Sequence, residues 1–259
     1  MFNQNFKRKL KELGLPTLFF IGGIFVWEII VLIFKIPEYF LPSPSMILKE
    51  IITNFNFLLS QLSITMFEAV VGFVIANILG FIVAVIFVHS KTIEGGLYPY
   101  ALALKMTPIV AIAPFLIIWF GVGIISKIAT VIIICFFPIL VNAIKGLRTI
   151  DNEALDLFKS LSASKWQIFL KLRLPSSLSY VFPALKTSTA LSIVGALVGE
   201  FVGGNQGIGY IILFYSTLFE TTKAFSAIVM IVFVGILFFW FISLIEKKVM
   251  RLQKLEEEK

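Results

Sequence analysis

Long apolar runs dominate this sequence and limit what it can fold into. Hydrophobic residues make up 59% of the 259 residues and charged residues only 14%, whereas soluble domains carry about 25% charged residues. The 28 phenylalanines would make a water-exposed globule insoluble, but they suit a surface that faces lipid. A helix needs roughly 17–25 apolar residues to cross a bilayer, so the sequence predicts an all-α membrane protein with six spans in one domain, residues 1–259. The spans lie at about residues 15–34, 66–88, 99–120, 124–144, 182–202 and 224–245.

Lysine and arginine residues collect on one side of these spans. With the N-terminus placed in the cytoplasm, sixteen cations fall on the cytoplasmic side and four on the outer side. Loops rich in Lys and Arg stay in the cytoplasm, so we expect both termini and the polar segment 145–180 to be cytoplasmic. The same cations account for the net charge of +7 without a nucleic-acid partner. The cytoplasmic group comprises Lys7, Arg8, Lys9, Lys11, Lys91, Lys145, Arg148, Lys159, Lys165, Lys171, Arg173, Lys247, Lys248, Arg251, Lys254 and Lys259, and the outer group comprises Lys35, Lys49, Lys127 and Lys223.

The outer segment between the first two spans, residues 35–65, predicts more than a loop. Three prolines interrupt helix formation at its start. Ser45 is then placed to cap a short helix that we expect to run to about Gln61. Its apolar residues favour a position along the membrane interface, although a plain spacer between two spans is equally compatible with them.

The longest polar interruption, residues 145–180, predicts two short amphipathic helices. Asp151 or Asn152 can cap the first helix, and Ser164 can cap the second, which we expect to end before Pro175. Several apolar side chains of these helices would lie in water unless the protein, the membrane or a partner covers them. The segment is therefore a candidate contact for a soluble partner. The side chains concerned are Phe158, Leu161 and Trp166.

This segment ends in Leu174-Pro175, and the spacing before that pair resembles the EAA motif of ATP-binding-cassette (ABC) importer permeases. The family pattern is Glu-Ala-Ala, three residues, Gly, nine residues, Ile, one residue and Leu-Pro. Here Asp156-Leu157-Phe158 stands for Glu-Ala-Ala, Ser162 stands for the Gly, and Leu172 stands for the Ile. The nearby Glu153-Ala154 pair does not have the required spacing to Leu-Pro.

Five further stretches, in the expected order, resemble permeases of the nitrate, sulfonate and taurine type, so the resemblance covers nearly the whole chain. They are Trp27-Glu28 with Leu41-Pro42-Ser43-Pro44-Ser45, Thr107-Pro108-Ile109-Val110-Ala111-Ile112-Ala113-Pro114, Trp119-Phe120-Gly121-Val122-Gly123, Phe137-Pro138-Ile139-Leu140 before Gly146, and Gly199-Glu200-Phe201 followed by Gly207-Ile208-Gly209-Tyr210.

The resemblance implies a type I ABC importer permease fold with six transmembrane helices. In that family a cytoplasmic coupling helix between the fourth and fifth spans inserts into a groove on an ATPase subunit. Two permease copies, as a homodimer or a heterodimer, form the translocation path in the bacterial cytoplasmic (inner) membrane, and an extracytoplasmic binding protein delivers the solute. The coupling residues that the motif assigns to this chain are Asp156, Leu157, Phe158, Leu161, Ser162, Ala163, Leu174 and Pro175.

The chain departs from the family pattern in two ways. Leu157 and Phe158 replace two alanines, which predicts a wider or more apolar groove on the ATPase. Ser162 replaces a glycine, and it would be strained if that position needs a positive φ angle. The chain also has no Gly-x-x-x-x-Gly-Lys-Ser/Thr loop, so we expect ATP to bind to a separate subunit and this chain to bind no cofactor.

Four residues are candidates for the translocation path or its gate. Glu200 and Gly199 lie near the outer end of the fifth predicted span, where an ionisable group in a membrane segment suggests a function. Pro108 and Pro114 interrupt helical hydrogen bonds in the third predicted span and should bend it. Broken helices at membrane depth often line cavities, although a kinked packing helix and close packing at glycine are equally compatible.

Three other charged residues lie in or beside the predicted spans. We expect Glu28 to be a hydrogen-bonding anchor and Glu68 to be solvated at the outer interface. Lys186 is placed to extend its ammonium group to the inner interface. None of the three needs a role in transport.

A secondary transporter or channel that works without ATP is the alternative hypothesis. It would predict charged residues near mid-bilayer and a cytoplasmic segment without exposed apolar side chains, and the sequence shows neither feature. An enzyme is disfavoured because the chain has one His, one Cys and no carboxylate pair at span depth. No catalytic or metal site is therefore predicted.

The substrate stays open on the sequence alone. Relatives of this type carry nitrate, taurine, alkanesulfonates, thiamine pyrimidine precursors or riboflavin. All arginines lie on the predicted cytoplasmic side, so no arginine is available for an anion path within the membrane. This distribution favours a neutral or aromatic organic solute. The arginines are Arg8, Arg148, Arg173 and Arg251.

Overall fold

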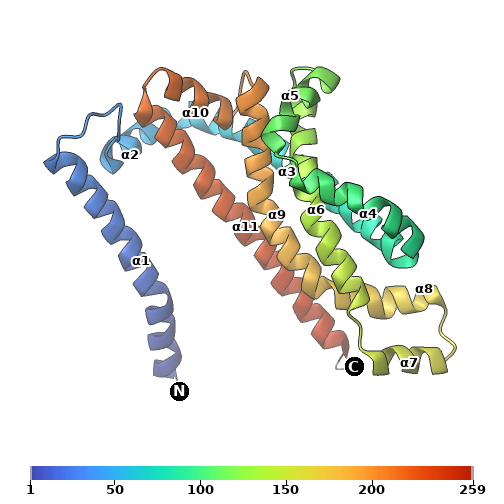
Figure 1. Ribbon diagram of the computed structural model, residues 1–259. Helices are drawn as coiled ribbons and strands as arrows, with labels where there is room; N and C mark the ends of the chain where they lie inside the picture. Colours follow the sequence, from blue (N-terminus) through green and yellow to red (C-terminus); the bar gives the residue numbers. More distant parts are fainter. Residues whose placement is uncertain (1, 258–259) are drawn as a thin grey trace. The chain divides into compact units, whose positions relative to one another are not determined.

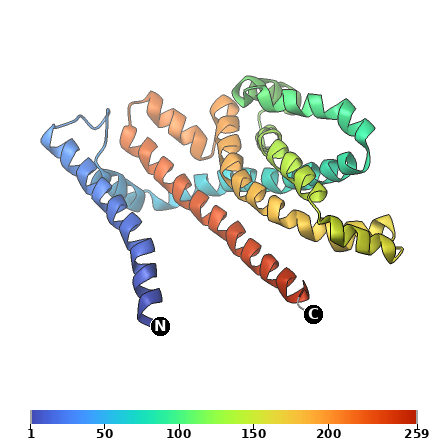
Figure 2. The same ribbon diagram turned by 60° about the horizontal axis from the view of Figure 1, so that its bottom comes forward.

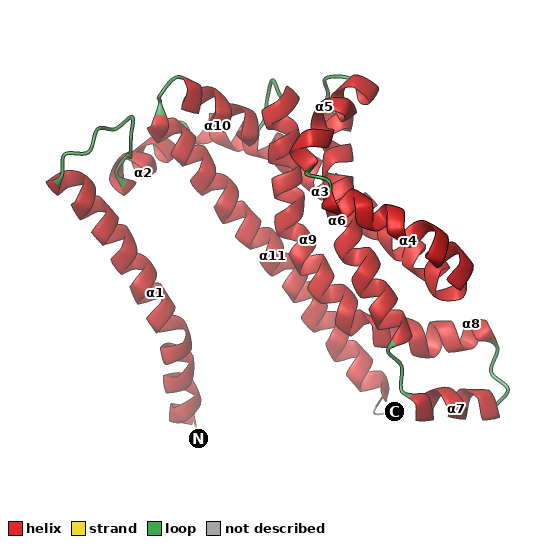
Figure 3. Ribbon diagram, viewed as in Figure 1, coloured by secondary structure: helices red, strands yellow, loops and turns green. Residues whose placement is uncertain are grey.

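The computed structural model describes the backbone of residues 2–257 and the side chains of residues 14–253. Every element of regular structure in this range is a helix (Figure 3). Among the cations used to orient the chain, Lys7, Arg8, Lys9, Lys11 and Lys254 have side chains outside the described range, and Lys259 lies outside the described residues altogether. In chain order (Figure 1) the elements are α1 (Phe2–Ile33), α2 (Pro44–Thr53), α3 (Phe55–His89), α4 (Lys91–Met106), α5 (Ile109–Phe120), α6 (Ile124–Arg148), α7 (Asn152–Ser160), α8 (Lys165–Ile168), η1 (Phe169–Arg173), α9 (Leu174–Gly203), α10 (Ile208–Thr217) and α11 (Thr221–Glu257).

Five of the six predicted spans each correspond to one long helical segment. These segments are apolar and long enough to cross a bilayer of ordinary thickness. The match confirms that these apolar runs form long helices. The segments are Gly14–Ile33, Phe55–His89, Ile124–Arg148, Lys165–Gly203 and Thr221–Gln253.

The third predicted span, residues 99–120, is not one straight helix. It corresponds to α4 and α5, which are bent by 103° at a short break. The break falls at Pro108, because proline lacks a backbone N–H and pushes the residue before it out of the α region. Thr107 accordingly has φ −77° and ψ 124°. Pro114 lies inside α5 without ending it, so Pro108 alone marks the break.

The outer helix α2 differs from its prediction at both ends. Its N-cap is Ser43 rather than Ser45, because Pro44 occupies the first helical turn, where its missing N–H would be unpaired anyway. α2 also stops well before the predicted end, and α3 begins at Phe55. Ser45 instead donates hydrogen bonds from its backbone N and its Oγ to the Glu28 carboxylate, at 2.9 and 2.7 Å. Glu28 is therefore the hydrogen-bonding anchor that we predicted.

The chain divides into two compact units, Met1–Leu59 with Ile211–Met230, and Ser60–Tyr210 with Ile231–Lys259. In the first unit, Trp27 of α1 packs against Phe225 of α11 with ring centroids 6.1 Å apart. The second, larger unit contains all the residues of the candidate sites described below.

The second unit is built around the close packing of α6 against α9 (Figures 1 and 2). Glycines permit this approach: a Cβ at Gly195 would lie 2.9 Å from Val131 Cα, and a Cβ at Gly146 would lie 2.9 Å from the Ser177 carbonyl oxygen. Large apolar side chains fill the end of the unit that carries α8 and η1. They include Phe87, Leu140, Ile144, Leu147 and Phe169.

The second short helix was predicted to end before Pro175, but it continues past this residue. α8 continues through the π-helical segment η1 directly into α9, so residues 165–203 form one continuous helical stretch. Pro175 lies in the first turn of α9, where proline is tolerated. The α8 helix is therefore joined to a membrane span without an intervening loop.

Candidate functional site

Two predicted caps begin the helices of residues 151–168, which we call the α7–α8 segment. Asp151 is the N-cap of α7, and its Oδ1 accepts a hydrogen bond from the backbone N–H of Glu153 at 3.0 Å. Ser164 caps α8 in a capping box: Gln167 N donates to Ser164 Oγ at 3.2 Å, and Ser164 N donates to Gln167 Oε1 at 2.7 Å. The caps fix where each short helix starts.

The turn between α7 and α8 contains a residue in the left-handed conformation. Ser162, which replaces the glycine of the family pattern, has a φ angle of 55°. Two hydrogen bonds close the turn in the Schellman arrangement, from Ser162 N to Lys159 O and from Ala163 N to Phe158 O, both at 2.9 Å. Because only glycine adopts this φ without a steric cost, Ser162 is a strained residue held by its neighbours.

Apolar side chains project outward from the α7–α8 segment. Leu157 is 57% exposed, Leu161 71% and Trp166 65%; together we call them the apolar face. Of the three side chains that we expected to need a cover, Phe158 is half-buried within the protein, whereas Leu161 and Trp166 are exposed. Leu157 and Leu161 are four residues apart and share one side of the helix, whereas Phe158 points to a different side. Of the predicted coupling residues, Asp156, Leu157, Leu161 and Ser162 are exposed, and Phe158, Ala163, Leu174 and Pro175 are half-buried.

The α7–α8 segment is tied to the spans through η1. Phe169 is buried in the apolar cluster that α3, α6 and α9 share, and Trp166 stacks on it with ring centroids 5.6 Å apart. Arg173 Nη1 donates a hydrogen bond to the carbonyl oxygen of Leu147 near the end of α6, at 2.9 Å. A displacement of the apolar face would therefore reach both α6 and α9.

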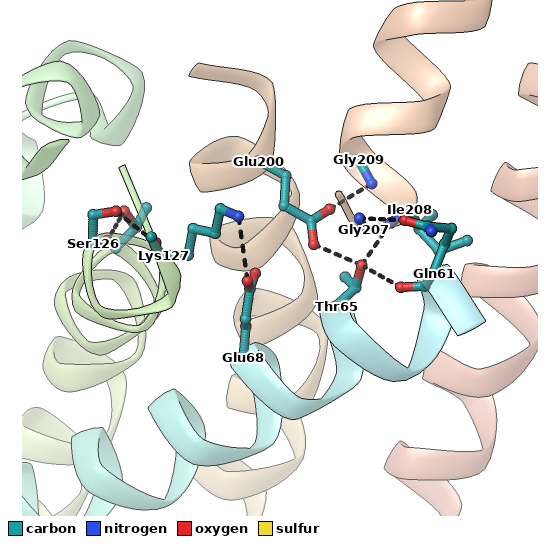
Figure 4. A network of polar contacts seen from close by, with 11 residues as sticks. Gln61, Thr65, Glu68, Ser126, Lys127, Glu200, Gly207, Ile208 and Gly209 are labelled. Atoms are coloured by element: carbon teal, nitrogen blue, oxygen red, sulfur yellow. Dashed lines mark hydrogen bonds and ion pairs between the residues drawn. The ribbon is translucent and has the colours of Figure 1, made fainter. Parts of the chain in front are cut away.

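A second group of candidates lies inside the second unit, and Figure 4 shows how its members face one another. Glu68 of α3 and Lys127 of α6 form an ion pair, with 3.5 Å between Oε1 and Nζ and with side chains 0% and 3% exposed. The prediction that Glu68 is solvated at the outer interface is wrong. Lys127, which we counted on the outer side at the start of the fourth predicted span, is also buried. Each charge is kept inside because the neighbouring helix supplies the opposite charge.

Glu200, near the end of α9, holds the turn that leads into α10. Its carboxylate accepts hydrogen bonds from Thr65 Oγ1 at 2.7 Å and from Gly209 N at 2.5 Å. Thr65 Oγ1 in turn accepts a hydrogen bond from Ile208 N at 2.7 Å. Ile208 and Gly209 begin α10, where backbone N–H groups have no partner within the helix and favour a nearby negative charge. Glu200 is 1% exposed, so it acts here as an internal cap.

Gly207 completes the same turn. Its φ angle of 99° lies in the region that favours glycine, and its N–H donates to Gln61 Oε1 at 2.7 Å. A Cβ at this position would overlap the Glu200 carboxylate. We call Gln61, Thr65, Glu68, Lys127 and Glu200 the buried polar cluster.

Of the four candidate path or gate residues, the structure brings two to the buried polar cluster. Gly199 lies against α6, where its Cβ would be 3.1 Å from Lys127 Cα, and Glu200 is a member of the cluster. Pro108 and Pro114 are exposed and belong to the α4–α5 bend. The role of all four residues in a path or gate stays a prediction.

Sequence reasoning missed Gln61, Thr65 and Lys127 as partners of the predicted acids. One signal was available for Lys127, because this lysine lies at the start of a long apolar run, where a buried charge needs an opposite charge. Gln61 and Thr65 gave no such signal, since polar residues are common at the end of a span. Their role depends on the approach of α10, which is remote in the sequence.

Lys186 pairs with an acid at the inner end of the last predicted span, and its position at the inner interface stays a prediction. Its Nζ lies 2.8 Å from the Glu246 carboxylate of α11, with side chains 25% and 22% exposed. The ion pair links α9 to the second half of α11. Within the described part of the chain, no three His, Cys, Asp or Glu side chains gather in a way that could hold a metal ion.

Comparisons with known proteins match this architecture. The family described as "Binding-protein-dependent transport system inner membrane component" matches residues 76–251. The formylaminopyrimidine transport permease protein ThiX of Halalkalibacterium halodurans is 32% identical over 89% of this chain and 92% of its own length. The riboflavin transport system permease protein RibX of Chloroflexus aurantiacus is 31% identical over 92% of this chain and 90% of its own length.

The fold is also found among solved structures. A chain of the inward-facing MetNI methionine ABC transporter matches 74% of this chain and 96% of its own length, with a TM-score of 0.61 and 17% sequence identity. This likeness concerns the fold, and it confirms the all-helical type I importer permease architecture. The family match covers most of the sequence and agrees with this fold. The chain belongs to the family of binding-protein-dependent transport system inner membrane components, the permease subunits of ABC importers.

Proposed function

We propose that the α7–α8 segment couples this permease to a separate cytoplasmic ATPase subunit, which binds and hydrolyses ATP. The observation that carries the proposal is the apolar face of Leu157, Leu161 and Trp166, which is exposed on two short, capped helices. A helix whose apolar side chains enter a groove gains roughly 25 cal/mol for each Å² of apolar surface removed from water. The contacts of Phe169 and Arg173 support transmission of the partner's movement to the spans.

The proposed assembly contains two permease copies in the cytoplasmic membrane. Both termini and the α7–α8 segment lie in the cytoplasm, as the distribution of Lys and Arg favours. An extracytoplasmic solute-binding protein delivers the solute to the opposite side. The family description, which names binding-protein dependence and the inner membrane, supports these partners.

The proposed substrate is a neutral, heteroaromatic organic solute. Two relatives that exceed 30% identity are named for the transport of a formylaminopyrimidine and of riboflavin, which are both heteroaromatic. The charge distribution agrees with this class. Lys127, buried within α6, is already paired with Glu68, and the arginines with described side chains, Arg148, Arg173 and Arg251, lie on the predicted cytoplasmic side.

The coupling proposal can be tested with the permease co-expressed with its ATPase and binding-protein partners and reconstituted in proteoliposomes. Leu157→Asp and Leu161→Asp place a charge in the apolar face. We expect each to lower ATP-dependent uptake and solute-stimulated ATP hydrolysis at least about tenfold, since a loss of 1.4 kcal/mol in docking already corresponds to that factor.

Asn152→Asp is the matched control, because it adds the same charge at an exposed position in the first turn of α7, where an acid is favoured. Its uptake should stay within about twofold of wild type. Unchanged uptake in both leucine variants would contradict the coupling role. Uptake that continues without ATP would instead favour a secondary transporter.

A further inference from the structure

A cavity of about 380 Å³ lies where the first half of α4 meets the last turns of α6. Its volume falls in the range of roughly 300–1,000 Å³ that is usual for ligand pockets. The cavity has an apolar wall and a charged end, which is the pattern of a site for an amphiphile. Its lining includes Glu94 and Tyr98 of α4, and Val141, Ile144, Lys145 and Arg148 of α6.

The charged end of this cavity has a positive excess. Arg148 Nη2 donates to Glu94 Oε2 at 2.5 Å, with side chains 41% and 21% exposed. A guanidinium group has five N–H donors, so this single contact leaves others available. Lys145 Nζ lies 5.4 Å from the ring centroid of Tyr180, and no carboxylate among the described residues forms an ion pair with it. Two cations therefore face one carboxylate.

We propose that this cavity binds the phosphate of an anionic phospholipid headgroup from the cytoplasmic leaflet. Lys145 and Arg148 would contact the phosphate, whose single negative charge balances the local excess. Val141 and Ile144 would contact the glycerol backbone and the first carbons of the acyl chains. Basic pockets between transmembrane helices on the cytoplasmic side suit such headgroups, because the leaflet concentrates anionic lipid there.

The apolar wall favours a lipid over a soluble phosphate compound. Inorganic phosphate or a small phosphate ester would satisfy Lys145 and Arg148 but would leave the half-buried Val141 against water. A phospholipid covers both ends of the cavity. The side chain of Tyr98, half-buried in the lining, has the apolar ring and polar hydroxyl that suit a membrane interface.

The position of the cavity gives the bound lipid an effect on coupling, and this part rests on the proposed function. Arg148 ends α6, and Asp151 caps α7 a few residues later. A headgroup held by Lys145 and Arg148 would fix the last turn of α6 next to the α7–α8 segment. We therefore expect anionic lipid to raise solute-stimulated ATP hydrolysis by the complex.

The test uses the purified complex of the permease with its ATPase subunits, in bilayers of phosphatidylcholine with increasing phosphatidylglycerol. Retained lipid is counted by native mass spectrometry. The double variant Lys145→Gln/Arg148→Gln should bind phosphatidylglycerol at least about tenfold more weakly. Lys247→Gln/Lys248→Gln removes the same charge from exposed positions of α11 and should bind it like wild type. Val141→Trp keeps both cations but fills the cavity, and it should also lose the lipid.

Several results would overturn the proposal. One is that Lys145→Gln/Arg148→Gln and Val141→Trp retain as much phosphatidylglycerol as the control Lys247→Gln/Lys248→Gln. Another is that wild type retains phosphatidylcholine and phosphatidylglycerol equally. Displacement of the lipid by millimolar glycerol phosphate would identify a soluble ligand instead. Loss of the ATPase subunits from Lys145→Gln/Arg148→Gln with lipid retained would assign these cations to the protein partner. Lipid retention and ATP hydrolysis are separate readouts, so failure of the coupling proposal is distinguishable from failure of the lipid site.

Discussion

The α7–α8 segment and the buried polar cluster each contain an ion pair, but in opposite surroundings. Asp156 and Lys159 lie 2.9 Å apart on α7, with side chains 74% and 59% exposed. Glu68 and Lys127 lie 3.5 Å apart on two different helices, with side chains 0% and 3% exposed. The surface pair competes with water and contributes little. The internal pair is shielded from water, so each buried charge is stabilised by the opposite charge of its partner.

The two regions also differ in which kind of side chain they expose: the α7–α8 segment exposes apolar side chains, and the buried polar cluster encloses charged ones. Leu157 of α7 and Leu161, which directly follows α7, face outward, whereas the charges of the buried polar cluster lie inside. The cluster therefore links α3, α6, α9 and the start of α10, and the α7–α8 segment is the proposed contact for a partner. Substitutions in the cluster should reduce stability, and substitutions in the segment should reduce coupling while stability is kept.

The largest effect is expected from Lys127→Met, which leaves Glu68 buried without a counter-charge. We expect the free energy of unfolding to fall by about 3–5 kcal/mol, measured by denaturant unfolding in detergent micelles. The double variant Lys127→Met/Glu68→Gln removes both charges and should recover much of this loss. Losses that simply add in the double variant would show that the two residues are not coupled.

The next effect is expected from Thr65→Val, which removes the hydroxyl that bridges Glu200 and the start of α10. One buried acceptor and one backbone donor then lose their partner, at a cost of about 1–3 kcal/mol in unfolding free energy. Thr65→Ser keeps the hydroxyl and is the control. Equal unfolding curves for the Val and Ser variants would argue against the bridge.

A smaller effect of opposite sign is expected from Ser162→Gly. Glycine relieves the steric cost of the φ angle of 55°, so the turn should gain about 0.5–1 kcal/mol locally. The measurement is the rate of amide hydrogen exchange at Ala163, whose N–H donates to Phe158 O. Ser162→Ala keeps the strain and should show no slowing; slower exchange in that variant would contradict the explanation.

The smallest effect is expected from Lys159→Met, the surface counterpart of Lys127→Met. Loss of the Asp156–Lys159 pair should change the unfolding free energy by less than about 0.5 kcal/mol. The same denaturant unfolding experiment measures it. A loss as large as that of Lys127→Met would remove the contrast between the two regions.

Local sequence chemistry predicted the features that depend on near neighbours. Asp151 and Ser164 cap their helices, and the position of Ser162 does require a positive φ angle. The apolar runs also identified five spans as single helices. These features follow from helix capping, φ preference and the length of apolar runs, which a few adjacent residues determine.

The features that sequence reasoning missed depend on contacts between remote segments. Glu68 was expected in water, but Lys127, from another helix, allows its burial. The sequence did not show which apolar side chain of α7 the protein covers: Phe158 is half-buried, whereas Leu157 is exposed. Both Pro108 and Pro114 were expected to bend the third span, but only Pro108 marks the 103° bend, because a proline can lie within a helix, kink it or end it.

Hydrogen–deuterium exchange of the permease with and without its ATPase subunits tests the central claim most directly. We predict that peptides covering residues 152–168 exchange at least about tenfold more slowly in the complex, since the apolar face becomes covered. Peptides around Glu68 and Glu200 should change far less, because these residues are already buried. Equal exchange of residues 152–168 in the free permease and in the complex would contradict the assignment of the α7–α8 segment as the ATPase contact.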